Sequence, residues 1–333
     1  MPTTTYGDIS DSRAAHFAAK ALAHTEPVIE LGRFGMTQEM PMNKSSIIVF
    51  RRAVTFGALT TPLVEGVTPS AQQMSYDRVE FTLRQYGKPI QLTDVTFDLA
   101  GEPVLDDAVI LAAEQGALTA EIFQWGQVKA GTSVFYANGA SRAAVNTPLV
   151  LSKVQAATAF LQAQKARPVT SIIAPGLEYA TRAIEPAFIA MGHTNLNSDI
   201  RALPGFMPAS QYGKRSIVSP NELGSVENVR FITSPEFTPY ADAGGAFAGS
   251  GAAMRTTAGT SADVYPMIVF GKDAYCNIPL KGKNAFTPMV VMPKPTDSDP
   301  LAQRGHVALK MYLAGGILNQ SWITRIECAA TAL

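Results

Sequence analysis

A strictly alternating segment constrains this fold more than any other feature of the sequence. In Arg78–Tyr86, apolar and polar residues alternate one by one, which predicts a strand with one covered face. Residues 47–54 form a second predicted strand, and residues 55–75 between them are rich in turn-forming residues. Gly87-Lys88-Pro89 is expected to break the second strand before it resumes. Residues 47–97 are therefore predicted to form one long β-hairpin.

A long hairpin needs a surface to lie on, because an isolated hairpin is only marginally stable in water. We expect the apolar side chains Val79, Phe81 and Leu83 to contact a neighbouring subunit. Arg51 and Arg52, beside the hairpin, are interpreted as inter-subunit ion-pair donors, with a solvated face as the alternative. On this hypothesis, Phe81→Asp blocks assembly and leaves the subunit folded.

The charge content also predicts an oligomer. Only 54 of the 333 residues are charged, 16%, and the net charge is zero, whereas soluble domains average about 25% charged residues. These charges are too few for the surface of a soluble monomer. Much of the surface is therefore expected to be buried against other subunits. Membrane insertion is disfavoured because no stretch approaches ~20 consecutive apolar residues. The N-terminus lacks the pattern of a signal peptide. The zero net charge argues against binding nucleic acid through charge.

The rest of the chain alternates helices and strands. A long helix is predicted over 104–130, with Asp106 and Asp107 favourable for its dipole and Gly131 as its stop. Ser152 and Gln155 match a capping box for a helix over 153–166. Its predicted inner face comprises Val154, Ala157, Leu161 and Gln164.

Further elements are expected on both sides of that helix. In the N-terminal part we predict a helix over 11–24 and an irregular stretch over 26–46, which together form an arm outside the core. The apolar stripe of that helix includes Phe17, a candidate inter-subunit contact. In the middle of the chain we predict strands at 169–174, 215–219 and 229–234, a helix near 176–185 and a small-residue loop at 241–262. The C-terminal strands are predicted at 264–270, 287–292, 305–314 and 320–329, as one antiparallel closing sheet.

No motif predicts catalysis, a cofactor or a metal. Cys276 and Cys328 are too few for a disulfide scaffold, and Cys276 is interpreted as a buried inert thiol. Residues 249–254 only approximate a dinucleotide fingerprint and are interpreted as a flexible loop. Asp297 and Asp299 are interpreted as a turn, with a cation site as the less favoured alternative. The four histidines are not spaced as metal ligands.

The order of these elements resembles the major capsid proteins of tailed bacteriophages, which have the HK-97 fold, and most of all the N-four-like branch. The stretches that carry the resemblance run from residue 4 to residue 327. They include Thr4–Ile9, Val49–Arg52, Thr60–Pro69, Gln85–Gly87, Thr93–Val95, Phe135–Gly139, Val269–Tyr275, Asp299–His306, Ile317–Asn319 and Arg325–Glu327.

The resemblance implies an α+β capsid fold with a fixed division of the chain. It implies an N-terminal arm (1–46), an extended loop (47–100), a peripheral domain with its spine helix (101–149), an axial domain (150–262) and returning peripheral strands (263–333). The implied function is a structural, non-enzymatic protein whose pentamers and hexamers form an icosahedral head around double-stranded DNA. An encapsulin-like compartment and an oligomeric enzyme remain as alternatives.

The resemblance also implies partners and a location. The protein would act in the virion, after assembly in the host bacterial cytoplasm, with no membrane and no cofactor. A separate scaffolding protein, a portal and decoration proteins are the implied partners, and the DNA is enclosed without sequence-specific binding. Lys88 and Asn138 lack the context of covalent cross-linking residues, so non-covalent locking is expected.

Overall fold

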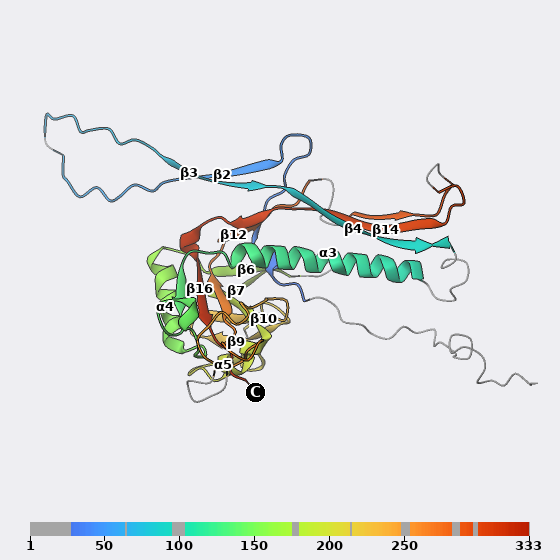
Figure 1. Cartoon of the computed structure of the whole chain (residues 1–333). Coiled ribbons are helices and arrows are strands. Elements are labelled where there is room, and N and C mark those ends of the chain that lie inside the picture. Colours follow the sequence, from blue (N-terminus) through green and yellow to red (C-terminus); the bar gives the residue numbers. More distant parts are fainter. Residues whose placement is uncertain are drawn as a thin grey trace, which may run out of the picture.

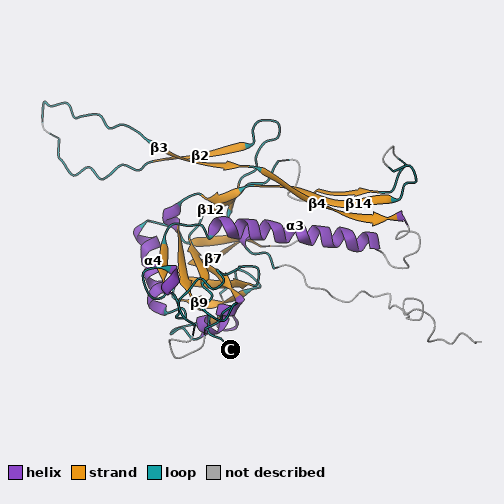
Figure 2. Ribbon diagram, viewed as in Figure 1, coloured by secondary structure: helices purple, strands orange, loops and turns teal. Residues whose placement is uncertain are grey.

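Three parts make up the molecule, as Figures 1 and 2 show: an α/β body, a long helix that extends from it and a β-hairpin that projects in the opposite direction. This computed structural model describes residues 28–63, 65–94, 104–174, 180–213, 215–247, 254–281, 287–295 and 299–332. The predicted helix 11–24 and its Phe17 lie outside the described residues.

The body is built on an eight-stranded mixed sheet, ordered β5-β16-β11-β7-β10-β9-β8, with β6 also paired to β7. Its strands are β5 (Val134–Tyr136), β6 (Val169–Ala174), β7 (Ala180–His193), β8 (Met207–Pro208), β9 (Glu222–Val226), β10 (Val229–Ser234), β11 (Tyr265–Phe270) and β16 (Ile323–Cys328). β10, β11 and β16 are buried along their whole length. Such strands belong to a sheet that is covered on both faces.

Alternate residues of the sheet pack into two different hydrophobic clusters. Phe188 and Ala190 share one cluster with helix α4 (Leu151–Ala163). Ile189 and Met191 share the other with Leu31 and with the C-terminal end of helix α3 (Val104–Val128). Because successive side chains of a strand point to opposite faces, α4 covers one face of the sheet, and α3 with the N-terminal segment covers the other.

Helix α4 begins earlier than predicted and without the predicted cap. Its N-cap residue is Val150, which makes no side-chain cap hydrogen bond, so the capping box at Ser152 is wrong. Val154, Ala157 and Leu161 are buried as predicted. Gln164 instead follows the last turn and is exposed. The position of this helix is therefore determined by burial of its apolar face and not by a side-chain cap.

Helix α3 matches its prediction closely and extends far beyond the body. Its inner end is fixed by Trp125, which is buried, stacks on Phe237 at 4.4 Å and donates from Nε1 to the Thr238 carbonyl at 3.2 Å. Its outer part carries a three-stranded antiparallel sheet, ordered β13-β14-β4. These strands are β4 (Arg84–Thr93), β13 (Thr287–Val291) and β14 (Arg304–Leu313). Ala108 and Ala112 of the helix pack with Val307 and Leu309 of β14.

The predicted hairpin over 47–97 is wrong beyond residue 83. Strand β2 (Ile47–Ala53) pairs antiparallel with β3 (Tyr76–Thr82), but β4 pairs with β14 along its whole length. Nor does Gly87-Lys88-Pro89 break β4. A Cβ at Gly87 would lie 2.6 Å from the Leu309 carbonyl oxygen, so glycine permits the close approach to β14. Pro89 is tolerated because β4 is an edge strand.

The described part of the N-terminal arm belongs to the core, contrary to the prediction. Strand β1 (Met36–Thr37) pairs with β12 (Tyr275–Asn277), which in turn pairs with β15 (Gly315–Ile317). Leu31 and Met40 are almost completely buried. The irregular local sequence concealed this, because the strands β12 and β15 that hold β1 lie more than 200 residues away in the chain.

Other differences from the predictions have physical reasons. Residues 180–185 belong to strand β7 and not to a helix, since pairing with neighbouring strands overrides local propensity. Residues 215–219 are not a strand. Their backbone bonds to side chains instead: the Val218 N–H donates to Glu222 at 2.6 Å, and the Ser216 carbonyl accepts from Arg230 at 2.8 Å.

The predicted C-terminal closing sheet is in fact two sheets. β11 and β16 join the body, whereas β13 and β14 join β4. The predicted domain boundaries at 149/150 and 262/263 therefore do not separate sheets. Short helical turns complete the described fold: η2 (Leu31–Arg33), η3 (Arg142–Ala144), η4 (Thr194–Leu196), α5 (Asn197–Arg201), η5 (Ala209–Gln211) and η6 (Gln320–Trp322).

Candidate assembly surface

The β2–β3 hairpin extends away from the body and ends in a long loop, residues 54–75 (Figure 1). Seven residue pairs, from Ile47↔Thr82 to Ala53↔Tyr76, hold its two strands in antiparallel register. The two strands form a sheet of their own. Most of their residues are exposed, so the hairpin buries little of itself against its own subunit.

Large apolar side chains line the loop and are exposed to solvent. Leu59 is 94% exposed and Leu63 is 79% exposed. Others at or next to the loop are Val54, Phe56, Val67, Met74 and Tyr76. Single exposed apolar residues are common on proteins, but a contiguous set at the end of a projecting element is typical of a protein–protein contact. The turn-forming residues of this loop predict its irregular backbone, but its local sequence pattern does not predict that these apolar residues are exposed.

The two predicted arginines are exposed and have partners in their own hairpin. Arg52 forms an ion pair with Asp77 across the strands at 3.2 Å. The Arg51 guanidinium lies 5.5 Å from the centre of the Tyr76 ring. The structure therefore brings both arginines into the hairpin, and their role between subunits stays a prediction.

The three predicted apolar contacts differ in their surroundings. Phe81 packs edge-on against Phe50 at 6.0 Å, and it lies close to Gly316, where a Cβ would be 2.5 Å from the Phe81 ring. Leu83 packs in the same cluster, around Cys276. Both residues thus fix the base of the hairpin to its own subunit. Phe81→Asp would consequently also weaken that attachment, so it is a poor test of assembly alone.

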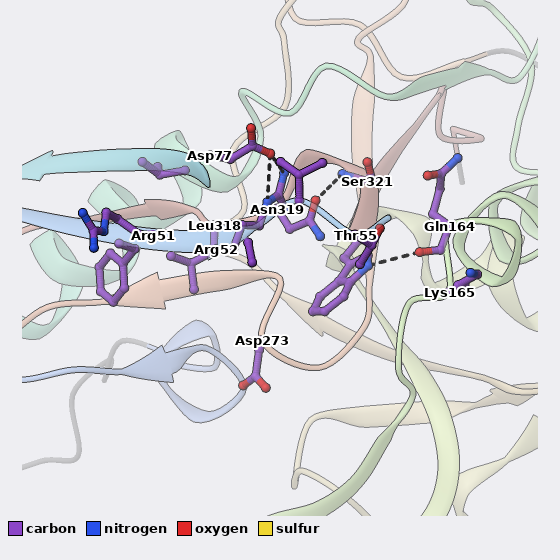
Figure 3. A pocket seen from close by; sticks show the side chains of 15 residues that line it. Arg51, Arg52, Thr55, Asp77, Gln164, Lys165, Asp273, Leu318, Asn319 and Ser321 are labelled. Carbon is purple, nitrogen blue, oxygen red and sulfur yellow. Dashed lines mark hydrogen bonds and ion pairs between the residues drawn. The ribbon is translucent and has the colours of Figure 1, made fainter. Parts of the chain in front are cut away.

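A cavity of about 580 Å³ lies at the base of the hairpin, and Figure 3 shows its lining. Arg51, Arg52 and Val79 line it from the hairpin, and Gln164 and Lys165 line it from the end of α4. Trp322 also borders it and donates from Nε1 to the Gln164 carbonyl at 3.3 Å. Three of the predicted contact residues therefore share one concave corner between hairpin and body.

A second exposed apolar area lies at the outer end of α3. Met289, Val290 and Val291 of β13 and the following Met292 are exposed, as are Ile110 and Leu111 of the helix. The sequence signal for it was the uninterrupted apolar run from Met289 to Met292, which predicts a strand covered on both faces. In the single subunit the successive residues of this run are all exposed, so neither face of the strand is fully covered.

The remaining chemical candidates carry no reactive arrangement. Burial raises the pKa of the Cys276 thiol to about 11 and raises that of Cys328 further, so both are protonated at neutral pH. The Asp299 carboxylate accepts a hydrogen bond from the backbone N–H of Arg304 at 2.9 Å and forms an ion pair with the Arg304 side chain at 3.6 Å. Asp297 lies outside the described residues. Among described residues, no three His, Cys, Asp or Glu side chains gather as metal ligands.

Membrane crossing by a helix finds no support in the part of the chain that the structure describes. None of its helices combines the length and the apolar character that such a crossing requires. Residues 249–253 of the near-fingerprint also lie outside the described residues.

The described geometry, with two elements projecting from a small body and exposed apolar surface on each, defines a structural subunit built to contact copies of itself. Comparison with known proteins agrees. Residues 77–323 match the family model described as phage capsid protein, which is about three quarters of the chain, and the chain belongs to that family. It is a structural shell protein of the phage head.

Solved capsid structures share the fold over nearly the whole chain. The capsid of Ralstonia phage GP4 matches with a TM-score of 0.70 and 13% identity, covering 99% of each chain. The capsid of cyanophage Pam1 matches with a TM-score of 0.63 and 12% identity, covering 98% of each. The capsid of cyanophage P-SCSP1u matches with a TM-score of 0.62 and 10% identity, covering 95% of this chain and 93% of the other. The fold is therefore of the HK-97 type. No curated protein matches by sequence.

Proposed function

We propose that this chain forms pentamers and hexamers of an icosahedral head through its β2–β3 hairpin, which lies over a neighbouring subunit. The observation that carries the proposal is the set of exposed apolar side chains on loop 54–75, above all Leu59 and Leu63. Burying each such side chain stabilises a contact by about 1.5–3 kcal/mol. Within the part of the subunit that the structure describes, both side chains remain largely exposed.

The corner beneath the hairpin gives the neighbour a place to lie. It is concave and bears the cations Arg51, Arg52 and Lys165 together with the anions Asp77 and Asp273. Mixed charges of this kind favour one docking register over others without a strong net field. The proposed inter-subunit contacts are accordingly Arg51, Arg52 and Val79. The proposed role of Phe81 and Leu83 is to fix the orientation of the hairpin relative to the body.

The wider assignment follows from the family. We propose that residues 101–149 and 263–333 act as the peripheral domain and residues 150–262 as the axial domain. The shell encloses double-stranded DNA in the virion after assembly in the host bacterial cytoplasm. A separate scaffolding protein, a portal and decoration proteins are its proposed partners. The family membership does not favour a compartment shell or an enzyme, and we propose that the chain has no catalytic activity.

The test is a variant that places charge on the loop. Leu59→Asp with Leu63→Asp should abolish closed shells in electron micrographs, because the contact would bury two unpaired carboxylates. The melting temperature of the unassembled subunit should stay within the change typical of surface substitutions, since both residues are exposed.

Gln72→Asp is the matched control, because it adds charge at an exposed polar position of the same loop. It should assemble normally. Normal shells from the Leu59/Leu63 variant would overturn the proposed role of the loop.

A further inference from the structure

A buried carboxyl on the spine helix attaches the N-terminal arm. Glu121 of α3 is 2% exposed, and its Oε1 accepts hydrogen bonds from the backbone N–H groups of Glu30 and Leu31, both at 3.0 Å. These groups open the short helix η2, whose first N–H groups have no partner inside the helix. Glu121 therefore caps η2 from another element and holds the arm to the helix.

A second carboxyl is buried in the same cluster. Glu30 is 1% exposed, and its Oε1 accepts from Ser219 Oγ at 2.7 Å and from Asn221 Nδ2 at 2.5 Å. Its Oε2 is buried without a hydrogen-bond partner among the described residues. Arg33 Nη1 lies 3.9 Å from that oxygen, which is a weak contact.

The groups around Glu121 favour its neutral form. The pKa of Glu121 is raised to about 7, chiefly by burial; the charges of Glu30 and Glu236 add to this rise, and the hydrogen bonds from the two arm N–H groups oppose it. Tyr275 faces the cluster from β12 and donates from its hydroxyl to the Leu31 carbonyl at 2.7 Å. Burial holds the pKa of Tyr275 well above its usual value, so this hydroxyl stays protonated.

The arm borders a cavity at this point. The cavity has a volume of about 220 Å³ and lies beside Glu121, lined by Ile29 and Gly32 from the arm and by Ala117 and Ala120 from α3, among others. The small side chains on the helix leave this space next to the carboxyl. The hydrogen bonds to Glu121 therefore act together with the burial of Leu31 in attaching the arm.

We propose that Glu121 is a proton-controlled latch: its neutral carboxyl holds residues 28–40 on the spine helix, and its ionisation loosens them. The loss of the proton places a second buried anion beside Glu30 and Glu236. The latch lies within a single chain, and its residues are separate from those of loop 54–75.

The direction of the pH effect follows from proton binding. While the arm is attached, the pKa of the Glu121 carboxyl is about 7, whereas that of a free glutamate carboxyl is 4.5. The stabilisation that the protonated carboxyl gives to the attached arm is therefore fully present below pH 4.5 and is lost as the pH rises through 7. Within that window a single proton changes the opening equilibrium by up to about tenfold per pH unit.

Amide hydrogen exchange of the full-length chain tests the latch. After correction for intrinsic rates, the amides of residues 28–40 should lose protection between pH 5.5 and pH 7.5 in the wild type. Glu121→Gln keeps a carbonyl acceptor for the arm but has no titrating proton, so its protection should be the same at both pH values. Glu39→Gln, an exposed carboxylate on the same arm, should behave as the wild type.

Two outcomes would overturn the latch. One is protection in the wild type that does not change with pH, and the other is an unchanged pH dependence in Glu121→Gln. If that variant fails to fold, Glu30→Gln decides: removing the neighbouring charge should move the midpoint of the wild-type transition to lower pH, and an unmoved midpoint would refute the proposal.

Discussion

Glu327 is the most strongly constrained charge of the body. It lies fully buried on β16 and accepts two hydrogen bonds from Arg142, at 2.9 Å from Nε and 2.7 Å from Nη2. The Arg325 Nε lies 2.8 Å from the same carboxylate. The Arg142 guanidinium also lies 3.6 Å from the centre of the Tyr240 ring. This one side chain thus ties η3 to the central sheet.

Glu327→Gln should lower the free energy of unfolding by about 3 kcal/mol, because it leaves the largely buried Arg325 guanidinium and the partly exposed Arg142 guanidinium without a counter-charge. Denaturant unfolding of the unassembled chain measures it. Asp77→Asn, which removes the exposed partner of Arg52, is the control and should cost less than about 1 kcal/mol. Equal costs for the two variants would show that Glu327 is not an electrostatic anchor.

At the scale of elements, the path of the chain from β3 into β4 decides the shape of the molecule. Leu83 separates the two strands, and its N–H donates to the Ser46 carbonyl at 2.8 Å. Up to this point the chain follows β2, and beyond it the chain follows β14 on the spine helix. The hairpin is therefore anchored at its base while its loop stays free for another subunit.

Gly87→Ala tests the close contact between β4 and β14. An added Cβ would lie 2.6 Å from a backbone oxygen, so we expect a loss of about 1–3 kcal/mol in unfolding free energy, as for overpacking. Gly126→Ala on α3 is the matched control. No atom lies within 4 Å of its added Cβ, and alanine favours the helix, so stability should rise by about 0.5–1 kcal/mol. A neutral Gly87→Ala would contradict the register described here.

At the scale of the whole molecule, the surface is partly apolar and weakly charged. The hairpin and the outer part of α3 project from the body and expose large apolar side chains such as Leu59, Leu63 and Leu111. With 16% charged residues and no net charge, this area is costly to leave in water. We expect assembly into a shell to cover it.

Assembly should therefore respond weakly to salt and strongly to temperature. Raising NaCl from ~0.1 M to ~1 M should change the yield of shells little, because few charges are there to be screened. Cooling should lower the yield, because apolar contacts weaken in the cold. Light scattering with sedimentation measures both. A steep loss of shells in high salt would show that ion pairs, and not apolar contacts, hold the subunits together.

Several features were predictable from local patterns. The apolar periodicity of Val154, Ala157 and Leu161 identified the inner face of α4, and the alternation around Val79 and Phe81 identified a strand. The low charge indicated an oligomer. Each of these features depends on a short window of sequence or on the composition. None of the three requires the partner of an element to be known.

The partners of those elements could not be predicted in the same way. The sequence alone determined elements with a clear local pattern, such as α3, α4 and β3, and its low charge indicated that the chain buries surface against copies of itself. Only the tertiary structure decided that β4 pairs with β14, that Leu31 lies in the core and that Phe81 packs on its own subunit. The reason is physical: periodicity encodes which face of an element is buried, whereas strand pairing uses backbone groups that are the same in nearly every residue.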